Sequence, residues 1–157
     1  MAQPHSDIAL QQVEIVRSTV VDNNYILTEW KPPVLTPTMV MGYKILRSSD
    51  QVNYNLIAIV SAPELSYSDR NVDIQNYQYY YKIEVLNHCN IETTPSDNSS
   101  SVLLKASITG NLAHLKWTKY LEWDTGVEKY IIEKKDEQGI WHEIKSVGGN
   151  TTEMEDE

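Results

Sequence analysis

The chain of 157 residues is 41% hydrophobic and 22% charged, and no apolar run in it approaches eighteen residues. This composition predicts a globular protein and excludes a helical membrane span. The 22 acidic residues outnumber 13 Lys and Arg, for a net charge of −9, and this negative charge argues against a nucleic-acid partner. Cys89 is the single cysteine, so packed apolar surface rather than an internal disulfide must stabilise the fold.

Short runs rich in Val, Ile, Thr and Tyr predict β-strands along the first 106 residues. In chain order the seven expected strands are residues 12–16, 25–30, 42–47, 54–60, 65–69, 77–87 and 100–106. Polar or Pro-containing turns separate them, as at 21–24, 31–33, 48–50 and 94–97. Seven short strands at this spacing are typical of a two-sheet β-sandwich.

A gap-free repeat links this segment to the remainder of the chain. An offset of 87 residues pairs Trp30 with Trp117 and Tyr43 with Tyr130. Laying residues 24–70 over 111–157 gives ten identities in 47 pairs, where roughly three are expected by chance. The counterpart of the tyrosine-rich strand around Tyr79 would fall near position 166, so the second unit is expected to lack its last two strands.

Side-chain alternation within the strands predicts a core built on aromatic residues. Residues two apart on a strand share a face, which places Trp30 toward the opposite sheet and Tyr43 across from it. An aromatic side chain is large enough to fill the gap of about 10 Å between two sheets. The expected core aromatics are Trp30, Tyr43, Tyr79, Tyr81, Trp117 and Tyr130.

Several of these segments resemble signature positions of fibronectin type III domains. They are Trp30-Lys31-Pro32-Pro33, Gly42-Tyr43-Lys44-Ile45 and Tyr79-Tyr80-Tyr81-Lys82-Ile83-Glu84-Val85, with Tyr79 at the tyrosine corner. More narrowly, residues 87–90 and 117–132 resemble the tandem fibronectin-like regions of gliding-motility-associated surface proteins that bacteria export by type IX secretion. The resemblance implies an all-β fold of two fibronectin type III-like (immunoglobulin-like) sandwiches, one at residues 8–105 and the first part of another at 106–157.

The resemblance further implies a secreted or cell-surface protein in which such sandwiches act as spacers, stalks or adhesive modules. Only residues 105–111 join the two units, without a Gly/Ser- or Pro-rich linker, so tight coupling is expected. Residues 1–7 lack the basic and apolar regions of an export signal. This favours either a cytoplasmic protein or a piece of a longer exported chain.

Catalytic and metal-binding patterns are weak throughout the sequence. Cys89 follows His88, but adjacent residues of an extended chain point to opposite faces. Oxygen ligands alternate from Asp69 to Asp73 as in a calcium loop, yet the turn glycine and the bidentate glutamate of such loops are missing. Asp69 is instead expected to anchor the turn that follows its strand. We therefore predict no enzyme, no cofactor and no metal site.

Trp123 is the one tryptophan without an aromatic counterpart in the repeat, because Thr36 aligns with it. Together with Tyr120 it is a candidate platform for a sugar ring or a partner protein, which leaves an accessory carbohydrate-binding module of an exported enzyme as the alternative function. The alternative is that Trp123 folds over the end of the sandwich beside Tyr120. A hydrolase would require Glu122 and Asp124 to converge in a cleft with a raised pKa.

The expected partners are proteins or neighbouring domains of a longer chain, with glycan as a further candidate and no membrane insertion. An incomplete second sandwich would expose an open sheet edge, since its last two strands would be absent. We expect that edge to be completed by a strand from another chain, by swapping, or by a continuation of the natural sequence.

Overall fold

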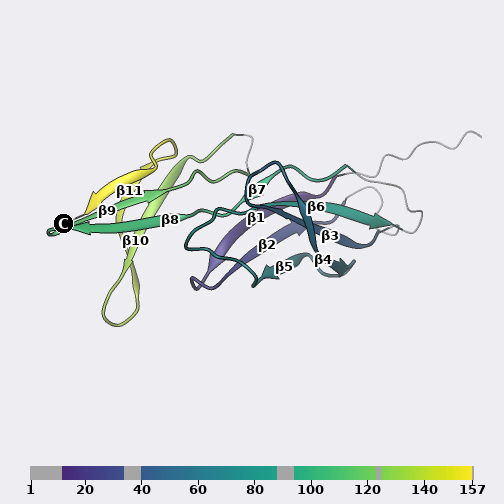
Figure 1. Ribbon diagram of the computed structural model, residues 1–157, viewed down its shortest axis with the longest axis horizontal. Helices are drawn as coiled ribbons and strands as arrows, with labels where there is room; N and C mark the ends of the chain where they lie inside the picture. Colours follow the sequence, from purple (N-terminus) through teal and green to yellow (C-terminus); the bar gives the residue numbers. More distant parts are fainter. Residues whose placement is uncertain (1–11, 34–39, 88–93, 123–124, 157) are drawn as a thin grey trace, which may run out of the picture.

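The computed structural model describes residues 12–33, 40–87, 94–122 and 125–156, and every regular element in these ranges is a β-strand (Figure 1). No helix in these ranges has the length and apolar character needed to cross a membrane. The strands are β1 (Glu14–Val21), β2 (Tyr25–Lys31), β3 (Val40–Ser48), β4 (Asn55–Ser61), β5 (Ser66–Asp69), β6 (Tyr80–Asn87), β7 (Ser99–Ser100), β8 (Leu104–Thr109), β9 (Leu112–Trp117), β10 (Lys129–Lys135), β11 (Trp141–Gly148) and β12 (Glu153–Asp156).

The first seven strands form a two-sheet sandwich. One sheet has the order β1-β2-β5 and the other the order β4-β3-β6-β7, and every neighbouring pair in them is antiparallel. This is the three-plus-four arrangement of fibronectin type III and related immunoglobulin-like sandwiches. The all-β sandwich expected from strand spacing is therefore confirmed. The turn expected at 21–24 is present as well, closed by a bond of 3.0 Å from Asn24 N to the carbonyl oxygen of Val21.

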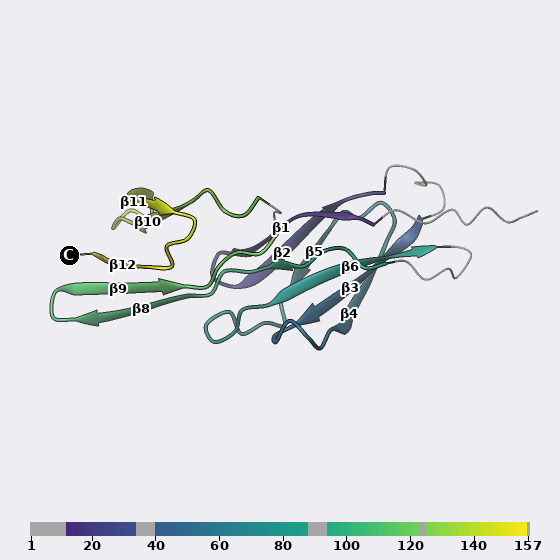
Figure 2. The same ribbon diagram turned by 90° about the horizontal axis from the view of Figure 1, so that it is seen from above.

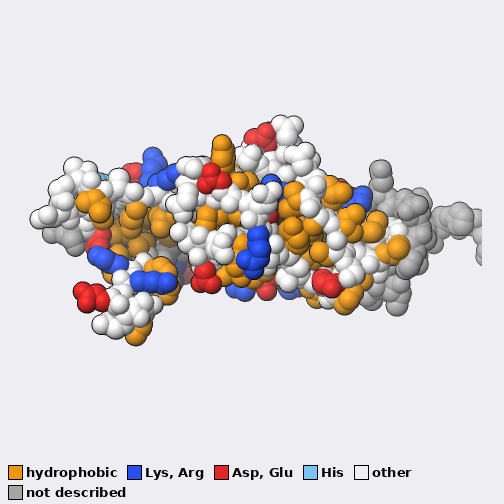
Figure 3. Space-filling view, turned by 60° about the horizontal axis from the view of Figure 1, so that its bottom comes forward, with side chains coloured by type: hydrophobic (Ala, Val, Ile, Leu, Met, Phe, Trp, Pro, Cys, Tyr) orange, Lys and Arg blue, Asp and Glu red, His pale blue; other side chains and the backbone are white. Residues whose placement is uncertain are grey.

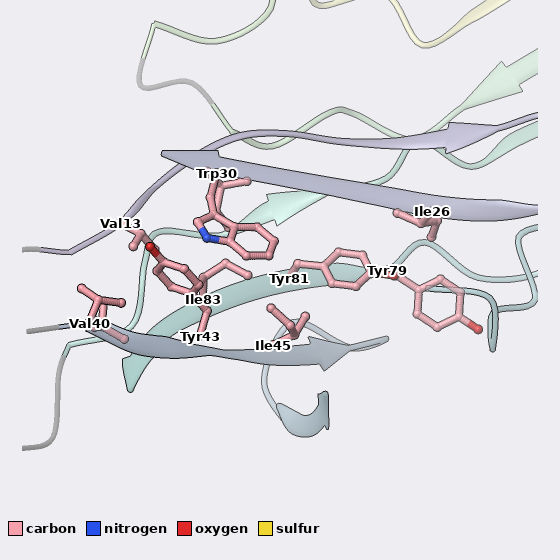
Figure 4. Close-up of a cluster of buried hydrophobic side chains, with 11 residues drawn as sticks. Val13, Ile26, Trp30, Val40, Tyr43, Ile45, Tyr79, Tyr81 and Ile83 are labelled. Carbon is pink, nitrogen blue, oxygen red and sulfur yellow. The ribbon is translucent and has the colours of Figure 1, made fainter. Parts of the chain in front are cut away.

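The core of this sandwich lies between the two sheets and is built on aromatic side chains (Figure 4). Trp30 on β2 is 2% exposed and Tyr43 on β3 is 1% exposed. Their rings meet edge to face, with centroids 5.3 Å apart and an interplanar angle of 67°, a geometry that aromatic pairs favour over face-to-face stacking. Tyr81 and Ile83 of β6 complete the layer and are fully buried.

A buried polar cluster connects the two sheets at one end of this core. Asp69, the last residue of β5, accepts hydrogen bonds from Arg47 at 2.8 Å and from the Tyr81 hydroxyl at 2.9 Å. Its other oxygen accepts a bond of 3.1 Å from the backbone N–H of Asn71. Asp69 therefore anchors the turn after β5 and also bonds to residues of the opposite sheet. Burial and the carboxylate beside it raise the pKa of Tyr81 far above its ordinary value, so Tyr81 acts only as a neutral donor.

The chain reaches β6 through a turn rather than through a longer strand. Residues 77–79 were expected to be part of that strand, but β6 begins at Tyr80. The reason is a tyrosine corner: the Tyr79 hydroxyl accepts a hydrogen bond of 3.0 Å from the backbone N–H of Asp73, which folds residues 73–78 back on themselves. Arg47 lies over the Tyr79 ring, 5.0 Å from its centroid.

The single strand expected at residues 100–106 is wrong. Residues 99–100 form β7 beside β6, whereas β8 begins at Leu104 in a different sheet. Between them the backbone changes partners: Ser101 N donates to the Tyr79 carbonyl at 2.9 Å, and Leu103 exchanges bonds with Thr118. The sequence hides this change, because the new backbone partners, Tyr79 and Thr118, are distant along the chain.

The last five strands form a second pair of sheets, in the orders β12-β9-β8 and β10-β11. Figures 1 and 2 show that these strands extend from one end of the first sandwich along the long axis of the molecule. The strands β9 to β12 repeat β2 to β5 at the offset of 87 residues. Asp156 pairs with Ala113 as Asp69 pairs with Ile26, and the register shift after Ile132 recurs where β3 has one after Ile45.

The tyrosine corner gives a stability prediction. Tyr79→Phe removes the acceptor for Asp73 N–H, and the loss of one such hydrogen bond costs about 1 kcal/mol of unfolding free energy. Tyr77→Phe is the matched control, because Tyr77 is 53% exposed and should change stability by less than about 0.5 kcal/mol. Urea unfolding monitored by circular dichroism measures both. Equal stability of the two variants would contradict a structural role for the Tyr79 hydroxyl.

Candidate functional site

A groove lies between the two sheets of the second pair. It has a volume of about 350 Å³ and is lined mainly by apolar side chains of β8 to β11, with Glu133, Lys134 and Asp156 as its charged lining residues. Apolar lining residues include Ala113, Leu115, Trp117, Tyr130, Ile132 and Ile144. Figure 3 shows hydrophobic side chains at the surface in this part of the molecule. The groove thus occupies the place that the packed core takes in the first sandwich.

The wall of the groove reproduces the aromatic pair of the first sandwich. Trp117 is 6% exposed, and its ring meets that of Tyr130 edge to face with centroids 5.6 Å apart and an interplanar angle of 64°. The Tyr130 hydroxyl accepts a hydrogen bond of 3.0 Å from Tyr120 N. Tyr130 is half-buried, whereas its counterpart Tyr43 is fully buried. The pair is therefore retained, but one side of it faces open space.

A second feature is the junction between the two pairs of sheets, which is closed by direct hydrogen bonds. Ser100 N donates to the Leu121 carbonyl at 2.8 Å, and Leu121 N donates back to the Ser100 hydroxyl at 2.9 Å. The Gln78 amide lies 2.9 Å from the carbonyl oxygens of both Ser101 and Lys119. Lys105 bonds to the carbonyl of Gln75. Three segments of the chain, residues 75–78, 100–105 and 119–121, therefore meet without an intervening linker.

Tyr120, a member of the candidate platform, lies in this junction. Its hydroxyl accepts a hydrogen bond of 3.2 Å from Ser18 N on β1, and the side chain is half-buried. Burial raises the pKa of Tyr120, while the Ser99 hydroxyl and the Ser18 N–H partly offset that rise. Tyr120 therefore connects the second pair of sheets to the first. Trp123, the other member, lies outside the described residues.

Glu122 is the titratable group that sequence reasoning placed in a hypothetical hydrolase. The pKa of Glu122 is raised to about 7, chiefly by burial; the Ser99 hydroxyl lowers it, and the negative charges of Asp97 and Glu14 add to the rise. Asp124, the proposed second acid, lies outside the described residues. Glu122 sits at the junction rather than in the groove, so the raised pKa reflects its packing between two units.

The other sequence candidates are distributed as follows. Cys89 and His88 lie outside the described residues. The Asp69 carboxylate is occupied by Arg47, Tyr81 and the Asn71 N–H, so a calcium ion would have to displace these protein groups. Within the described ranges no three His, Cys, Asp or Glu side chains are grouped to hold a metal ion.

Sequence reasoning missed the junction residues Gln78 and Ser100 and the Lys134–Asp156 pair. The pair, with 3.5 Å between Lys134 Nζ and Asp156 Oδ2, repeats Arg47–Asp69 at the offset of 87. The repeat could have revealed the Lys134–Asp156 pair, because the basic residue and the acidic residue of the Arg47–Asp69 pair both recur at that offset. Nothing in the sequence marks Gln78 or Ser100, since their partners are backbone groups far along the chain.

Comparison with known proteins finds solved structures that are similar to this chain. No family model and no curated protein matches the chain. Part of a β-1,2-glucanase from Parabacteroides distasonis is similar over 59% of the chain, with 21% identity and a TM-score of 0.50, and the chain spans 12% of that glucanase. A two-domain fibronectin type III segment of chicken tenascin matches over 91% of the chain and 79% of its own, with 18% identity and a TM-score of 0.43. The FN1–FN3 domains of chicken CNTN1 match over 92% and 56%, with 12% identity and a TM-score of 0.47.

The raised pKa of Glu122 gives a pH prediction. Because its pKa is about 7 in the fold, above the ordinary glutamate value of 4.5, the folded state holds the proton more tightly than the unfolded chain does, and stability rises as pH falls from 8 toward 6. Glu122→Gln removes this dependence and should raise the Tm at pH 8 by about 2–4 °C. Thermal melts at pH 6 and 8 measure this, with Glu143→Gln, on an exposed side chain, as control. A variant that keeps the wild-type pH dependence would contradict this assignment.

Proposed function

We propose that the chain is a non-enzymatic scaffold whose tandem fibronectin type III-like sandwiches hold a fixed orientation and present a surface to a partner. The hydrogen-bonded junction is the observation that carries this proposal. Reciprocal bonds between Ser100 and Leu121, and the Gln78 amide between two carbonyl groups, tie the units through backbone atoms. Flexible linkers between sandwiches lack such bonds. A stiff pair of sandwiches suits a spacer or stalk.

The proposed division is a first sandwich at residues 8–105 and the first part of a second at 106–157, without its last two strands. Repetition of strand pairing at the offset of 87 supports two units. The strand β8 begins at Leu104, so this boundary falls just inside it. The short connection is also what allows Lys105 to reach Gln75 and Asn76.

We place this scaffold in a secreted or cell-surface protein of a bacterium, with a role associated with gliding motility and export by type IX secretion. The resemblance of residues 87–90 and 117–132 to tandem regions of such proteins supports this placement. An adhesive or protein-binding role at the surface is consistent with an open apolar groove beside a rigid junction.

A carbohydrate-binding module of an exported enzyme is the second candidate. Its support is the aromatic side chains that lie outside the core. Tyr77 and Trp141 are more than half exposed, and Trp123 has no aromatic counterpart in the first repeat. Flat aromatic rings are the usual platform for sugar rings. Binding on a glycan array that Trp123→Ala abolishes would support this candidate, whereas no binding would favour the scaffold.

The scaffold proposal is tested by the distance between the units. Spin labels at Ile59→Cys and Ile108→Cys, both exposed positions, in a Cys89→Ser background should give one narrow distance distribution in electron paramagnetic resonance. Gln78→Ala should broaden it, because the amide no longer bonds to Lys119. Gln138→Ala, in the exposed β10–β11 turn, should leave it unchanged. A broad distribution in the chain without either substitution would contradict a rigid spacer.

A further inference from the structure

The edge of β10 that faces away from β11 lies beside the apolar groove. Within the described ranges β10 pairs only with β11, whereas its counterpart β3 pairs with β4 on one side and β6 on the other. An exposed strand edge carries unpaired N–H and C=O groups, and the groove beside it carries apolar side chains. A small apolar ligand would cover the apolar side chains of the groove but would leave the backbone N–H and C=O groups of the β10 edge unpaired. An extended strand can pair with the backbone groups and also cover the apolar side chains.

The equivalence of β10 and β3 predicts the register of such a strand. On β3, Tyr43 lies opposite Val85, Ile45 opposite Ile83, and Arg47 opposite Tyr81. At the offset of 87 residues the corresponding positions of β10 are Tyr130, Ile132 and Lys134. All three line the groove. In the first sandwich the β6 side chains at these places are almost completely buried.

The pair Lys134 and Asp156, which lines the groove, indicates which residue lies at one end of the strand. In the first sandwich, Asp69 binds Arg47 and also accepts the Tyr81 hydroxyl hydrogen. In the second, Asp156 lies 3.5 Å from Lys134, and both residues line the groove. Asp156 is thus placed to accept a hydrogen bond from a tyrosine that enters opposite Lys134.

We propose that this groove binds one extended strand with the side-chain chemistry of β6, antiparallel to β10. The strand has a tyrosine opposite Lys134 with its hydroxyl on Asp156, and β-branched residues opposite Ile132 and Tyr130. A second copy of the chain fits less well, because antiparallel pairing of two β10 strands about Ile132 would put Lys134 opposite Tyr130. In β3 the residue opposite Tyr43 is the apolar Val85.

The chain itself supplies the probe for this proposal. Because the repeat offset is 87, a copy of residues 71–103 attached directly after Glu157 brings the β6 sequence to the predicted distance from β10. Tethering also gives the strand an effective concentration in the millimolar range, about that of short flexible linkers. We expect amide hydrogen exchange along β10 to slow by roughly 100-fold, with β3 unchanged. Nuclear Overhauser contacts should connect Asp156 to the ring of the tyrosine that copies Tyr81.

The matched control replaces the four inward residues of the copy, Tyr79, Tyr81, Ile83 and Val85, by Ser and keeps its outward residues. It should leave β10 exchange at the rate of the unextended chain. Tyr81→Phe within the copy should reduce the protection by about fivefold, the equivalent of one hydrogen bond. Should the extended chain fail to fold, a free peptide of residues 77–87 titrated into the full chain provides the second measurement. The control is the Ile140→Ser variant of the full chain, which changes an exposed side chain of the β10–β11 hairpin and should bind the peptide as the unsubstituted chain does.

Three outcomes would overturn the proposal. The first is equal β10 exchange with the native copy and with the Ser-substituted copy, or no shift of β10 resonances on adding the peptide. The second is concentration-dependent dimerisation of the unextended chain that protects β10, which would identify a second copy as the occupant. The third is binding of the strand at β3 by displacement of β6. None of these results decides whether the junction is rigid, so the scaffold proposal is tested separately.

Discussion

The edge-to-face contact between a tryptophan on one sheet and a tyrosine on the other is the interaction on which this architecture depends. Trp30 with Tyr43, and Trp117 with Tyr130, meet at nearly the same distance and angle. An aromatic pair of this size sets the separation of two sheets and fixes which face of each strand points inward.

What surrounds the pair differs between the two units, and the difference determines where the molecule is open. Around Trp30 and Tyr43, the strand β6 completes the core with Tyr81 and Ile83, and Asp69 binds residues of the opposite sheet. Around Trp117 and Tyr130, an apolar groove takes that place. The junction sits between these regions and, through Tyr120, contacts both Ser18 and Tyr130. A closed unit and an open unit are thereby joined directly.

Most strands and the repeat could be predicted from the sequence, because strands follow from local alternation and the repeat follows from spacing along the chain. Trp30 and Trp117 recur at a fixed offset, and their facing tyrosines follow from the period of two. The change of sheet between Ser100 and Leu104 was not predicted, since it depends on hydrogen bonds with Tyr79 and Thr118 that are distant in sequence. The pKa of Glu122 likewise depends on packing between units, which no local pattern encodes.

Nuclear Overhauser spectroscopy on the uniformly labelled full chain tests most directly whether both units use the same aromatic frame. The two tryptophan rings, Trp30 and Trp117, should each give strong contacts to one tyrosine ring, that of Tyr43 and that of Tyr130, because the ring centroids are 5.3 Å and 5.6 Å apart. Similar contact patterns for the two pairs are the predicted result. A Trp117 ring without contacts to Tyr130 would contradict the account.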